Sequence, residues 1–318
     1  EFHDHFSKSS IQSMEYSSVP LGICGIGGFL ITFKCLGFPE LSSNLIESIS
    51  VDSIKTDRNL DFIAGACGCV GPLLTTSSQK SLDLAYQACI RIKDMQDISG
   101  AWDINPSFSK LISFAHGTSG FIAALVRCAL TLHTDEFDLA IKRAVDYERK
   151  MFNKELLTWP DLRRSYNDTV LSWCHGAPSV LLSRCCLVGT KYWDEYCENE
   201  IILGLQAIQK MRFTGEKNIC CGNFGLATIC SIVEIASSYL SPNAHNKILE
   251  LIHLNRQKIF NDISSPAGLD FLVNNKDTLM ETGLFTGISG IGLSVSSRSL
   301  PLLATVISGD LLKLQNLE

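Results

Sequence analysis

The sequence lacks any cluster of basic residues. Its 27 Lys and Arg residues are outnumbered by 33 Asp and Glu residues, which gives a formal net charge of -6. A nucleic-acid surface needs grouped Lys and Arg side chains to neutralise phosphates. We therefore expect no nucleic acid among the partners of this chain.

Long apolar runs are also missing. Apolar stretches are interrupted by Gly, Ser or charged residues well before the roughly 20 residues that a bilayer span requires. The first ten residues, EFHDHFSKSS, are polar and have no apolar segment of the kind found in signal peptides. The sequence therefore predicts no transmembrane segment and a cytoplasmic location. Because it does not begin with Met, we expect residues 1–318 to be a piece of a longer protein.

Signals for β-strands are equally scarce. No Asn-Gly or Asp-Gly turn joins segments of alternating polarity, and no alternation of strands with helices is visible. With 46% hydrophobic residues, the chain can still build a large core. These features favour an all-helical protein.

Cysteine, in contrast, is abundant. The chain has 13 cysteines, an odd number, and two pairs are adjacent, Cys185-Cys186 and Cys220-Cys221. Neighbouring cysteines rarely bridge each other, because a disulfide needs a particular arrangement of the two Cβ atoms. We therefore expect free thiols in a reducing compartment, with some of them binding a metal ion.

A repeated motif extends through the whole chain: a glycine, two further residues, a second glycine and then an apolar stretch. The second glycine is Ser179 in the fourth copy and Gly in the other five. We number the six units by their first glycines, which are Gly25, Gly65, Gly117, Gly176, Gly222 and Gly287. Repeats of this length, about 50 residues, leave room for two helices in each unit.

The helices of each unit have different patterns. The stretch after the glycines is apolar on nearly every side, as at 121–132, which is typical of a buried helix. The intervening segments are amphipathic, with apolar residues three and four apart, as at Leu82, Ala85, Cys89 and Ile92. Alternating buried and half-exposed helices predict an inner ring inside an outer ring, that is, an α/α toroid formed by residues 1–318 as a single domain.

Residues that bind metals cluster immediately before the glycines of three consecutive units. Because the glycines mark equivalent points of the repeat, the residues before them should meet at one end of the toroid. Thiolate and imidazole ligands favour Zn²⁺, and a catalytic zinc site keeps one position open. The residues concerned are His116, Cys174, His175, Cys220 and Cys221.

The remaining cysteines and histidines have a simpler interpretation. A single Cys within a helix is usually a small core residue, and Cys24 and Cys67 lie near glycine pairs without a second Cys or His beside them. We therefore interpret these cysteines as structural: Cys24, Cys67, Cys89, Cys128, Cys185, Cys186, Cys197 and Cys230.

With these motifs, the chain resembles the LanC-like lanthionine cyclases, and in particular the C-terminal cyclase domain of class II (LanM-type) lanthipeptide synthetases. The resemblance is carried by AHGTSG at 115–120, WCHGAP at 173–178 and CCGNFG at 220–225, and the repeats extend it over nearly the whole chain. It implies an α,α-toroid with a zinc ion at one end of its cavity. It also implies a dehydrated precursor peptide as substrate, whose Cys thiols are added to dehydroalanine or dehydrobutyrine.

The resemblance assigns roles to individual residues. It implies Cys174, Cys220 and Cys221 as zinc ligands; because the family usually has His where Cys221 stands, the chain is similar to the three-cysteine subgroup that includes the prochlorosin synthetases. His116 matches an active-site His that is not a ligand, and Asp61 matches an Asp close to it. An ordinary helix N-cap is the alternative for Asp61.

Three positions depart from the family pattern or vary within it. Ser179 replaces a family Gly, and Val170 stands where some stand-alone cyclases carry an Arg, so a role for that Arg is unsupported here. His175 occupies a position where other members have Tyr, and we expect it to lie next to the zinc ligands without binding the metal itself.

Other functions are compatible with parts of this pattern. The first alternative is a non-catalytic LanC-like module whose zinc is structural or which binds thiols of the glutathione type. Another α/α-barrel enzyme, such as a glycosidase, would need paired carboxylates, whereas the residues before the glycines offer only Asp61. A purely structural helical repeat would bind no stoichiometric metal. The resemblance to class II synthetases implies that residues 1–318 are the C-terminal part of a longer protein with an N-terminal dehydratase domain. Nothing in this sequence resembles a kinase glycine loop or catalytic loop, so we expect dehydration to be supplied by that domain.

Overall fold

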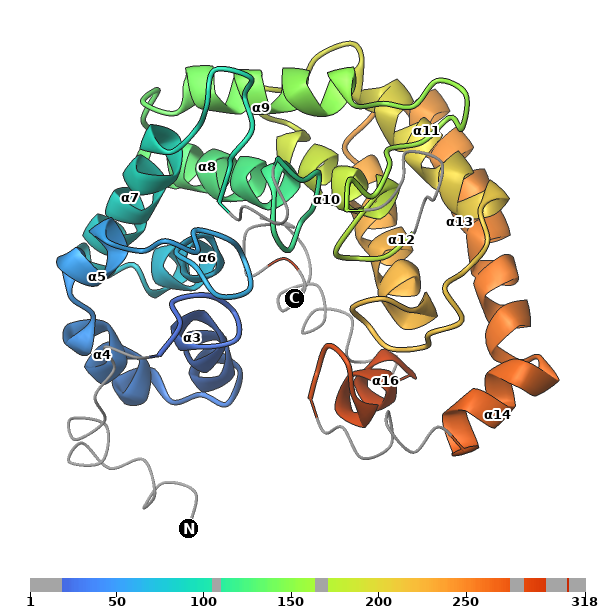
Figure 1. The fold of residues 1–318 in the computed structure, drawn as a ribbon, viewed down its shortest axis with the longest axis horizontal. Helices are drawn as coiled ribbons and strands as arrows, with labels where there is room; N and C mark the ends of the chain where they lie inside the picture. The colour runs from blue at the N-terminus through green and yellow to red at the C-terminus, as the bar shows by residue number, and fades with distance from the viewer. Residues whose placement is uncertain (1–18, 105–109, 164–170, 275–282, 296–307, 309–318) are drawn as a thin grey trace.

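The computed structural model describes residues 19–104, 110–163, 171–274, 283–295 and 308, and this part of the chain is helical (Figure 1). In these ranges, β-type pairing is limited to three isolated bridges, with no strand. None of the described helices is long and apolar enough to cross a membrane. The predicted all-α class is confirmed.

Each glycine pair leads into a helix of the inner layer, as the repeat predicts. Five of these helices begin at the residue after the first glycine, and α6 begins two residues after it. Side chains are buried around most of the circumference of α8 and α10, as expected for helices covered on all sides. The inner helices are α3 (Ile26–Cys35), α6 (Cys67–Thr76), α8 (Thr118–Leu132), α10 (Ala177–Leu187), α12 (Asn223–Ser237) and α16 (Ile288–Val295).

The remaining helices form the outer layer. In α7, Ala85, Cys89 and Ile92 of the predicted apolar stripe are buried, and Leu82, its fourth member, is partly buried against the core. The outer helices are α4 (Pro39–Ser48), α5 (Val51–Lys55), α7 (Gln79–Asp94), α9 (Asp138–Lys150), α11 (Cys197–Lys210), α13 (Pro242–Ile263) and α14 (Pro266–Asn274).

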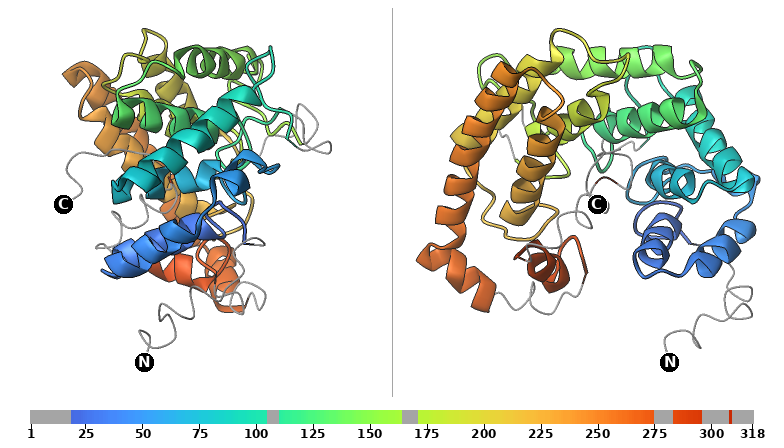
Figure 2. Two further views of the ribbon diagram at one scale, coloured as in Figure 1. Left: turned by 90° about the vertical axis from the view of Figure 1, so that its left-hand side faces the viewer. Right: turned by 180° about the vertical axis from the view of Figure 1, so that it is seen from behind.

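The two layers follow concentric arcs. Successive inner helices contact each other from α3 to α16, and α6, α8, α10 and α12 each pack against the outer helix that follows them in sequence. Seen from the front and from behind, the inner helices lie side by side around the centre and the outer helices surround them (Figures 1 and 2). This architecture is the predicted α/α toroid.

The second glycine of each pair is required by a close backbone contact. A Cβ atom on Gly120 would lie 2.3 Å from the carbonyl oxygen of Phe114, and one on Gly225 would lie 1.9 Å from that of Ile219. In unit 4, Ser179 stands at this position, and its hydroxyl donates a hydrogen bond of 3.0 Å to the corresponding carbonyl, that of Trp173. The residue that replaces the family Gly thus donates a hydrogen bond to the carbonyl that a glycine would leave without this donor.

A buried carboxylate joins the central units. Glu148 in α9 is fully buried, and one of its oxygens accepts hydrogen bonds from Thr118 and Ser119 in the first turn of α8. Its other oxygen accepts from Ser183 and from the fully buried Arg184 in α10. The inner helices of units 3 and 4 are therefore held to the outer layer through one side chain.

Replacement of Glu148 by Gln should destabilise the protein strongly. The change would remove a negative charge that balances the buried guanidinium of Arg184. Removing one partner of a buried ion pair typically costs about 3–5 kcal/mol of folding free energy. Urea unfolding of the variant should show a midpoint clearly below that of the parent. Glu250→Gln, at an exposed position of α13, is the control and should leave the midpoint nearly unchanged. Equal midpoints for Glu148→Gln and the parent would contradict a structural role for this ion pair.

Candidate metal and acid–base site

The segments before the inner helices form one continuous layer at one end of the toroid. Units 1 to 4 are joined in sequence by hydrogen bonds, and units 5 and 6 are joined in the same way. These links run from the Ile23 N–H to the Phe62 carbonyl (3.0 Å), from the Phe62 N–H to the Ala115 carbonyl (3.0 Å), from the Ser113 hydroxyl to the Cys174 carbonyl (2.5 Å) and from the Cys220 N–H to the Phe285 carbonyl (2.8 Å).

Aromatic side chains from several of these loops pack against one another. Trp173 is fully buried, and its ring lies 5.8 Å from that of Phe62, 6.0 Å from that of Phe114 and 4.7 Å from that of Phe285. These rings come from units 2, 3, 4 and 6. Packing at such separations is favourable for aromatic pairs, so the rings help to hold the loops of these four units together.

Four of the loops contain the same side-chain turn. In units 2 to 5, the fourth residue before the first glycine is polar and accepts a hydrogen bond from the backbone N–H three residues later, as Asx and Ser/Thr turns do. We call these four the turn-opening residues. Asp61 accepts from the Ala64 N–H (2.7 Å), and Ser113 accepts from the His116 N–H (2.9 Å). Ser172 accepts from the His175 N–H (3.2 Å), and Asn218 accepts from the Cys221 N–H (2.8 Å).

Three thiols from two of these loops converge. The Sγ atom of Cys174 lies 3.7 Å from that of Cys220 and 4.0 Å from that of Cys221, and the two adjacent cysteines are 3.5 Å apart. Metal–sulfur bonds of about 2.3 Å in tetrahedral geometry place sulfurs about 3.8 Å apart. The three thiols therefore have the spacing of a metal site, and they are the one such group within the described ranges.

The protonation of these thiols is tightly coupled. Hydrogen bonds from Cys174 and Cys220 lower the pKa of Cys221 against the opposing effect of burial. Contact with Cys174 and with Cys221, together with burial, raises the pKa of Cys220. Because three neighbouring thiolates repel each other, full deprotonation of the cluster needs a cation, which a divalent metal ion supplies.

His116 and Asp61 form a hydrogen-bonded pair. The Nδ1 atom of His116 lies 2.7 Å from an Asp61 carboxylate oxygen, and the imidazole is 40% exposed. The other carboxylate oxygen accepts the N–H groups of Ala64 and Gly65. Asp61 is therefore not the N-cap of α6, which begins at Cys67, but it does brace a backbone turn while binding the ring of His116. A carboxylate accepts, so Nδ1 is the donor, and in the neutral form of the ring the lone pair is on Nε2.

His175, the residue after Cys174, is buried. Its ring lies 6.1 Å from that of His116, and neither of its nitrogens forms a hydrogen bond with a described group. Burial lowers the pKa of His175 to about 3, so the imidazole is neutral. The nearest carboxylate, the fully buried Asp161, is 3.7 Å from its Nδ1 atom and is bound by Arg163.

The predicted site residues thus occupy a single layer, and sequence reasoning missed several residues around them. Ser113, Ser172 and Asn218 share the register of Asp61, which was the available signal, whereas nothing in the sequence linked Asp161 to His175. Val170 lies outside the described residues. Of the eight cysteines interpreted as structural, seven are buried as expected, and Cys67 among them contacts the Gly120 carbonyl at 3.3 Å. Cys24 is exposed, so its interpretation as a core residue was wrong.

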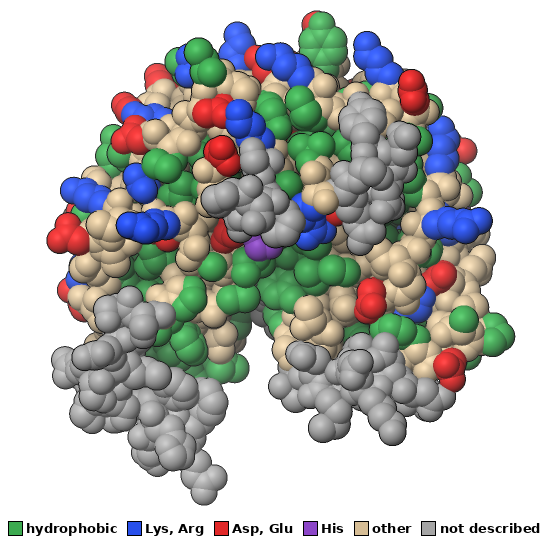
Figure 3. Space-filling model, in the orientation of Figure 1, with side chains coloured by type: hydrophobic (Ala, Val, Ile, Leu, Met, Phe, Trp, Pro, Cys, Tyr) green, Lys and Arg blue, Asp and Glu red, His purple; other side chains and the backbone are tan. Residues whose placement is uncertain are grey.

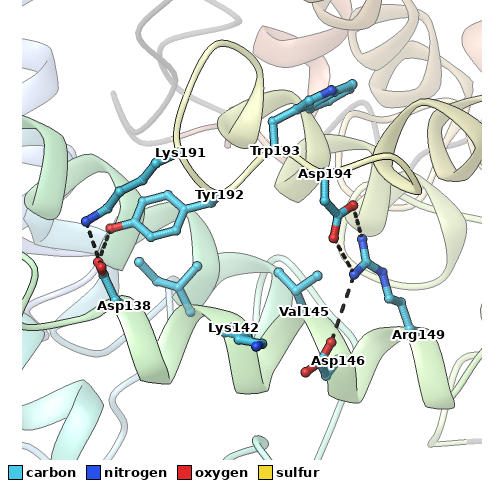
Figure 4. A pocket seen from close by; sticks show the side chains of 10 residues that line it. Asp138, Lys142, Val145, Asp146, Arg149, Lys191, Tyr192, Trp193 and Asp194 are labelled. Carbon is cyan, nitrogen blue, oxygen red and sulfur yellow. Dashed lines mark hydrogen bonds and ion pairs between the residues drawn. The ribbon is translucent and has the colours of Figure 1, made fainter.

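The face seen in Figure 3 is hollowed between the two flanks of the molecule, and hydrophobic side chains line much of the hollow. A separate pocket of about 290 Å³ lies between α9 and the segment before α11 (Figure 4). Its ends are closed by ion pairs from Asp138 to Lys191 and from Arg149 to Asp194. None of the five predicted site residues lines that pocket.

Comparison with known proteins agrees with this architecture. Residues 3–304 match the family described as "Lanthionine synthetase C-like protein". No curated protein sequence matches the chain. Among solved structures, nisin cyclase superposes with a TM-score of 0.63 at 19% sequence identity, over 93% of this chain and 82% of that one. At that identity, the likeness supports the toroidal fold.

Proposed function

The chain belongs to the lanthionine synthetase C-like family, and on that premise we propose that it is a zinc-dependent lanthionine cyclase. Its substrate would be a precursor peptide that contains dehydroalanine or dehydrobutyrine together with Cys. The observation that carries the proposal is the convergence of Cys174, Cys220 and Cys221 at sulfur separations of 3.5–4.0 Å in the same layer as His116.

The donor set suits zinc. Thiolate sulfur is a preferred ligand of Zn²⁺, and three protein ligands are the usual number at a catalytic zinc. When bound, zinc would accept the substrate sulfur in its fourth position and favour loss of the thiol proton. Cys174, Cys220 and Cys221 are the residues proposed to hold it.

His116 is proposed to move the proton. Its Nε2 lone pair can take the proton from the Cys thiol of the substrate, and that sulfur then adds to the β-carbon of the dehydro residue. A C–S bond forms, the electron pair of the double bond moves towards the neighbouring carbonyl oxygen, and the α-carbon is then protonated. His116 can return the same proton, so the reaction consumes none. Asp61 keeps the Nδ1 atom protonated and the ring oriented.

The assay for this proposal must follow thiols, because ring closure does not change the mass of the peptide. A synthetic peptide with one Cys and one dehydroalanine should lose its reactivity towards N-ethylmaleimide when it is incubated with the zinc-loaded protein. The same peptide with Ala for dehydroalanine should keep it. A protein that binds the peptide without consuming thiol would instead be the non-catalytic thiol-binding module.

The proposal also covers the class of cyclase, its location and the source of the dehydrated peptide. We propose that residues 1–318 act as one cyclase domain of the class II type, in the cytoplasm, with dehydration of the precursor supplied by another domain of the parent protein. The three-cysteine ligand set supports the subgroup that resembles the prochlorosin synthetases, because Cys221 stands where the family usually has His.

Replacing Cys221 with His should slow ring closure and narrow the range of accepted peptides. Three thiolates give the zinc centre a formal charge of -1, whereas two thiolates and an imidazole give 0. The more negative centre leaves the substrate sulfur more electron-rich, and thiolate nucleophilicity rises with basicity, so we expect a rate loss of roughly threefold to tenfold.

Rates for several peptides of different ring size should be compared in the parent and in Cys221→His, with zinc content measured in both. Equal rates across the panel at equal zinc content would contradict the proposed effect of the third thiolate.

A further inference from the structure

Ser113 connects the two functional parts of the site. Its side chain is fully buried. The oxygen accepts a hydrogen bond of 2.9 Å from the backbone N–H of His116 and donates one of 2.5 Å to the backbone carbonyl of Cys174. One hydroxyl therefore links the chain at the proposed proton carrier to the chain at a proposed metal ligand, across the boundary between units 3 and 4.

The direction of these bonds follows from the chemistry of the groups. A carbonyl oxygen only accepts, so the hydroxyl proton must point towards Cys174, and a lone pair of the same oxygen then faces the His116 N–H. The turn itself requires only that the side chain accept a hydrogen bond from the backbone N–H three residues later, as the Asp61 carboxylate does in unit 2. The donated bond to the next unit is thus an addition to the turn, made possible by a hydroxyl at this position.

Other contacts hold His116 from the opposite side. Asp61 binds the imidazole at 2.7 Å, and the N–H of Phe62 binds the carbonyl of Ala115 at 3.0 Å, so unit 2 fixes the ring and the preceding residue. These contacts set the position of His116 relative to unit 2. They do not set its distance from the sulfurs, which lie in units 4 and 5.

We infer that Ser113 is a positioning residue, which sets the separation between the His116 imidazole and the Cys174 sulfur. The inference rests on the proposed function and adds a residue to it. Misplacement of a reacting group by about 1 Å can cost a hundredfold in rate. Ser113 would act only through His116, without touching the substrate.

The test is a double-mutant cycle measured with the thiol assay. Ser113→Ala is expected to lower kcat by roughly tenfold to a hundredfold, with KM unchanged and a zinc content equal to that of the parent. In a His116→Asn background, followed over longer incubation, Ser113→Ala should have no further effect, because the group that it positions is absent. Ser81→Ala is the control, since this serine in α7 is equally buried and its hydroxyl bonds only within its own turn.

The outcomes separate the inference from the proposed function. An inactive parent would overturn both. If the parent is active and Ser113→Ala has the same kcat as the parent, the inference alone is overturned. The same holds if Ser113→Ala lowers the rate by the same factor in the parent and in His116→Asn, because equal losses indicate general loosening of the fold. If Ser113→Ala does not fold, Ser113→Cys takes its place in the cycle, because it keeps nearly the same shape with a weaker donor and acceptor.

Discussion

Replacing Cys174 with Ala is expected to remove zinc and ring closure together. The parent should bind about one zinc per chain, as a three-ligand catalytic site does, and the variant should retain almost none after dialysis. Cys174 is the proposed ligand from unit 4, whereas the proposed ligands Cys220 and Cys221 both come from unit 5. Two thiols on adjacent residues leave half of a tetrahedral site without protein ligands, so removal of Cys174 should affect affinity strongly.

The effect on the reaction should be equally large. Zinc contributes several kcal/mol to reactions in which it stabilises developing charge, and the loss of that contribution corresponds to a rate lower by roughly a hundredfold to a thousandfold. The N-ethylmaleimide assay gives the rate, and elemental analysis of the dialysed protein gives the zinc content.

Thermal unfolding supplies an independent readout. A metal that binds only the folded protein raises the melting temperature, so added zinc should raise Tm in the parent and leave Tm of the Cys174→Ala variant unchanged. Cys186→Ala is the matched control, because this thiol is also buried and lies in α10, the helix that follows Cys174. Full zinc content and activity in Cys174→Ala would overturn the assignment of the thiol cluster as the metal site.

The position of this cluster could be predicted from sequence because the repeat supplies a register. Once Gly176 and Gly222 are recognised as equivalent, Cys174 and Cys221 must lie in neighbouring loops at the same end of the inner helices. The glycines are recognisable because the close approach of a carbonyl leaves no room for a Cβ atom, as at Gly120 and Gly225. A steric requirement of this kind produces the same letter in almost every unit.

The turn-opening residues were harder to find for the opposite reason. Carboxylate, hydroxyl and amide oxygens can all accept the same backbone N–H, so Asp61, Ser113, Ser172 and Asn218 perform one task with three different residue types. A search for the same residue type at equivalent positions of the repeat does not detect them. The resemblance pointed to Asp61, but Ser113 became apparent only when its bond to Cys174 was seen.

The buried ion pair could not be predicted from sequence patterns either. Glu148 and Arg184 are separated by 36 residues and lie in different helices, yet their side chains are 2.6 Å apart and fully buried. In sequence, each resembles an ordinary charged residue on a helix surface. Their pairing depends on how α9 and α10 are both packed against α8, which periodicity does not determine.

Replacing His116 with Asn should separate proton transfer from metal binding. The variant should keep its zinc, because His116 is not among the proposed ligands, and its KM for the peptide should change little. Its kcat should fall by roughly a hundredfold to ten thousandfold, the usual contribution of a positioned acid or base. Asp61→Asn should cost less, about tenfold to a hundredfold, since it removes only the group that orients the ring.

The measurement is kcat and KM for the same dehydrated peptide, with zinc content determined in each variant. His253→Asn, in the middle of α13, serves as the control and should behave like the parent. If His116→Asn kept full activity, the proton would have to be carried by another group. His175 is poorly suited to that task, because it is 1% exposed and its low pKa keeps it neutral. A substrate-bound water molecule would then be the remaining route, and the hydrogen bond of Asp61 to His116 would serve only to hold the loops of units 2 and 3 together.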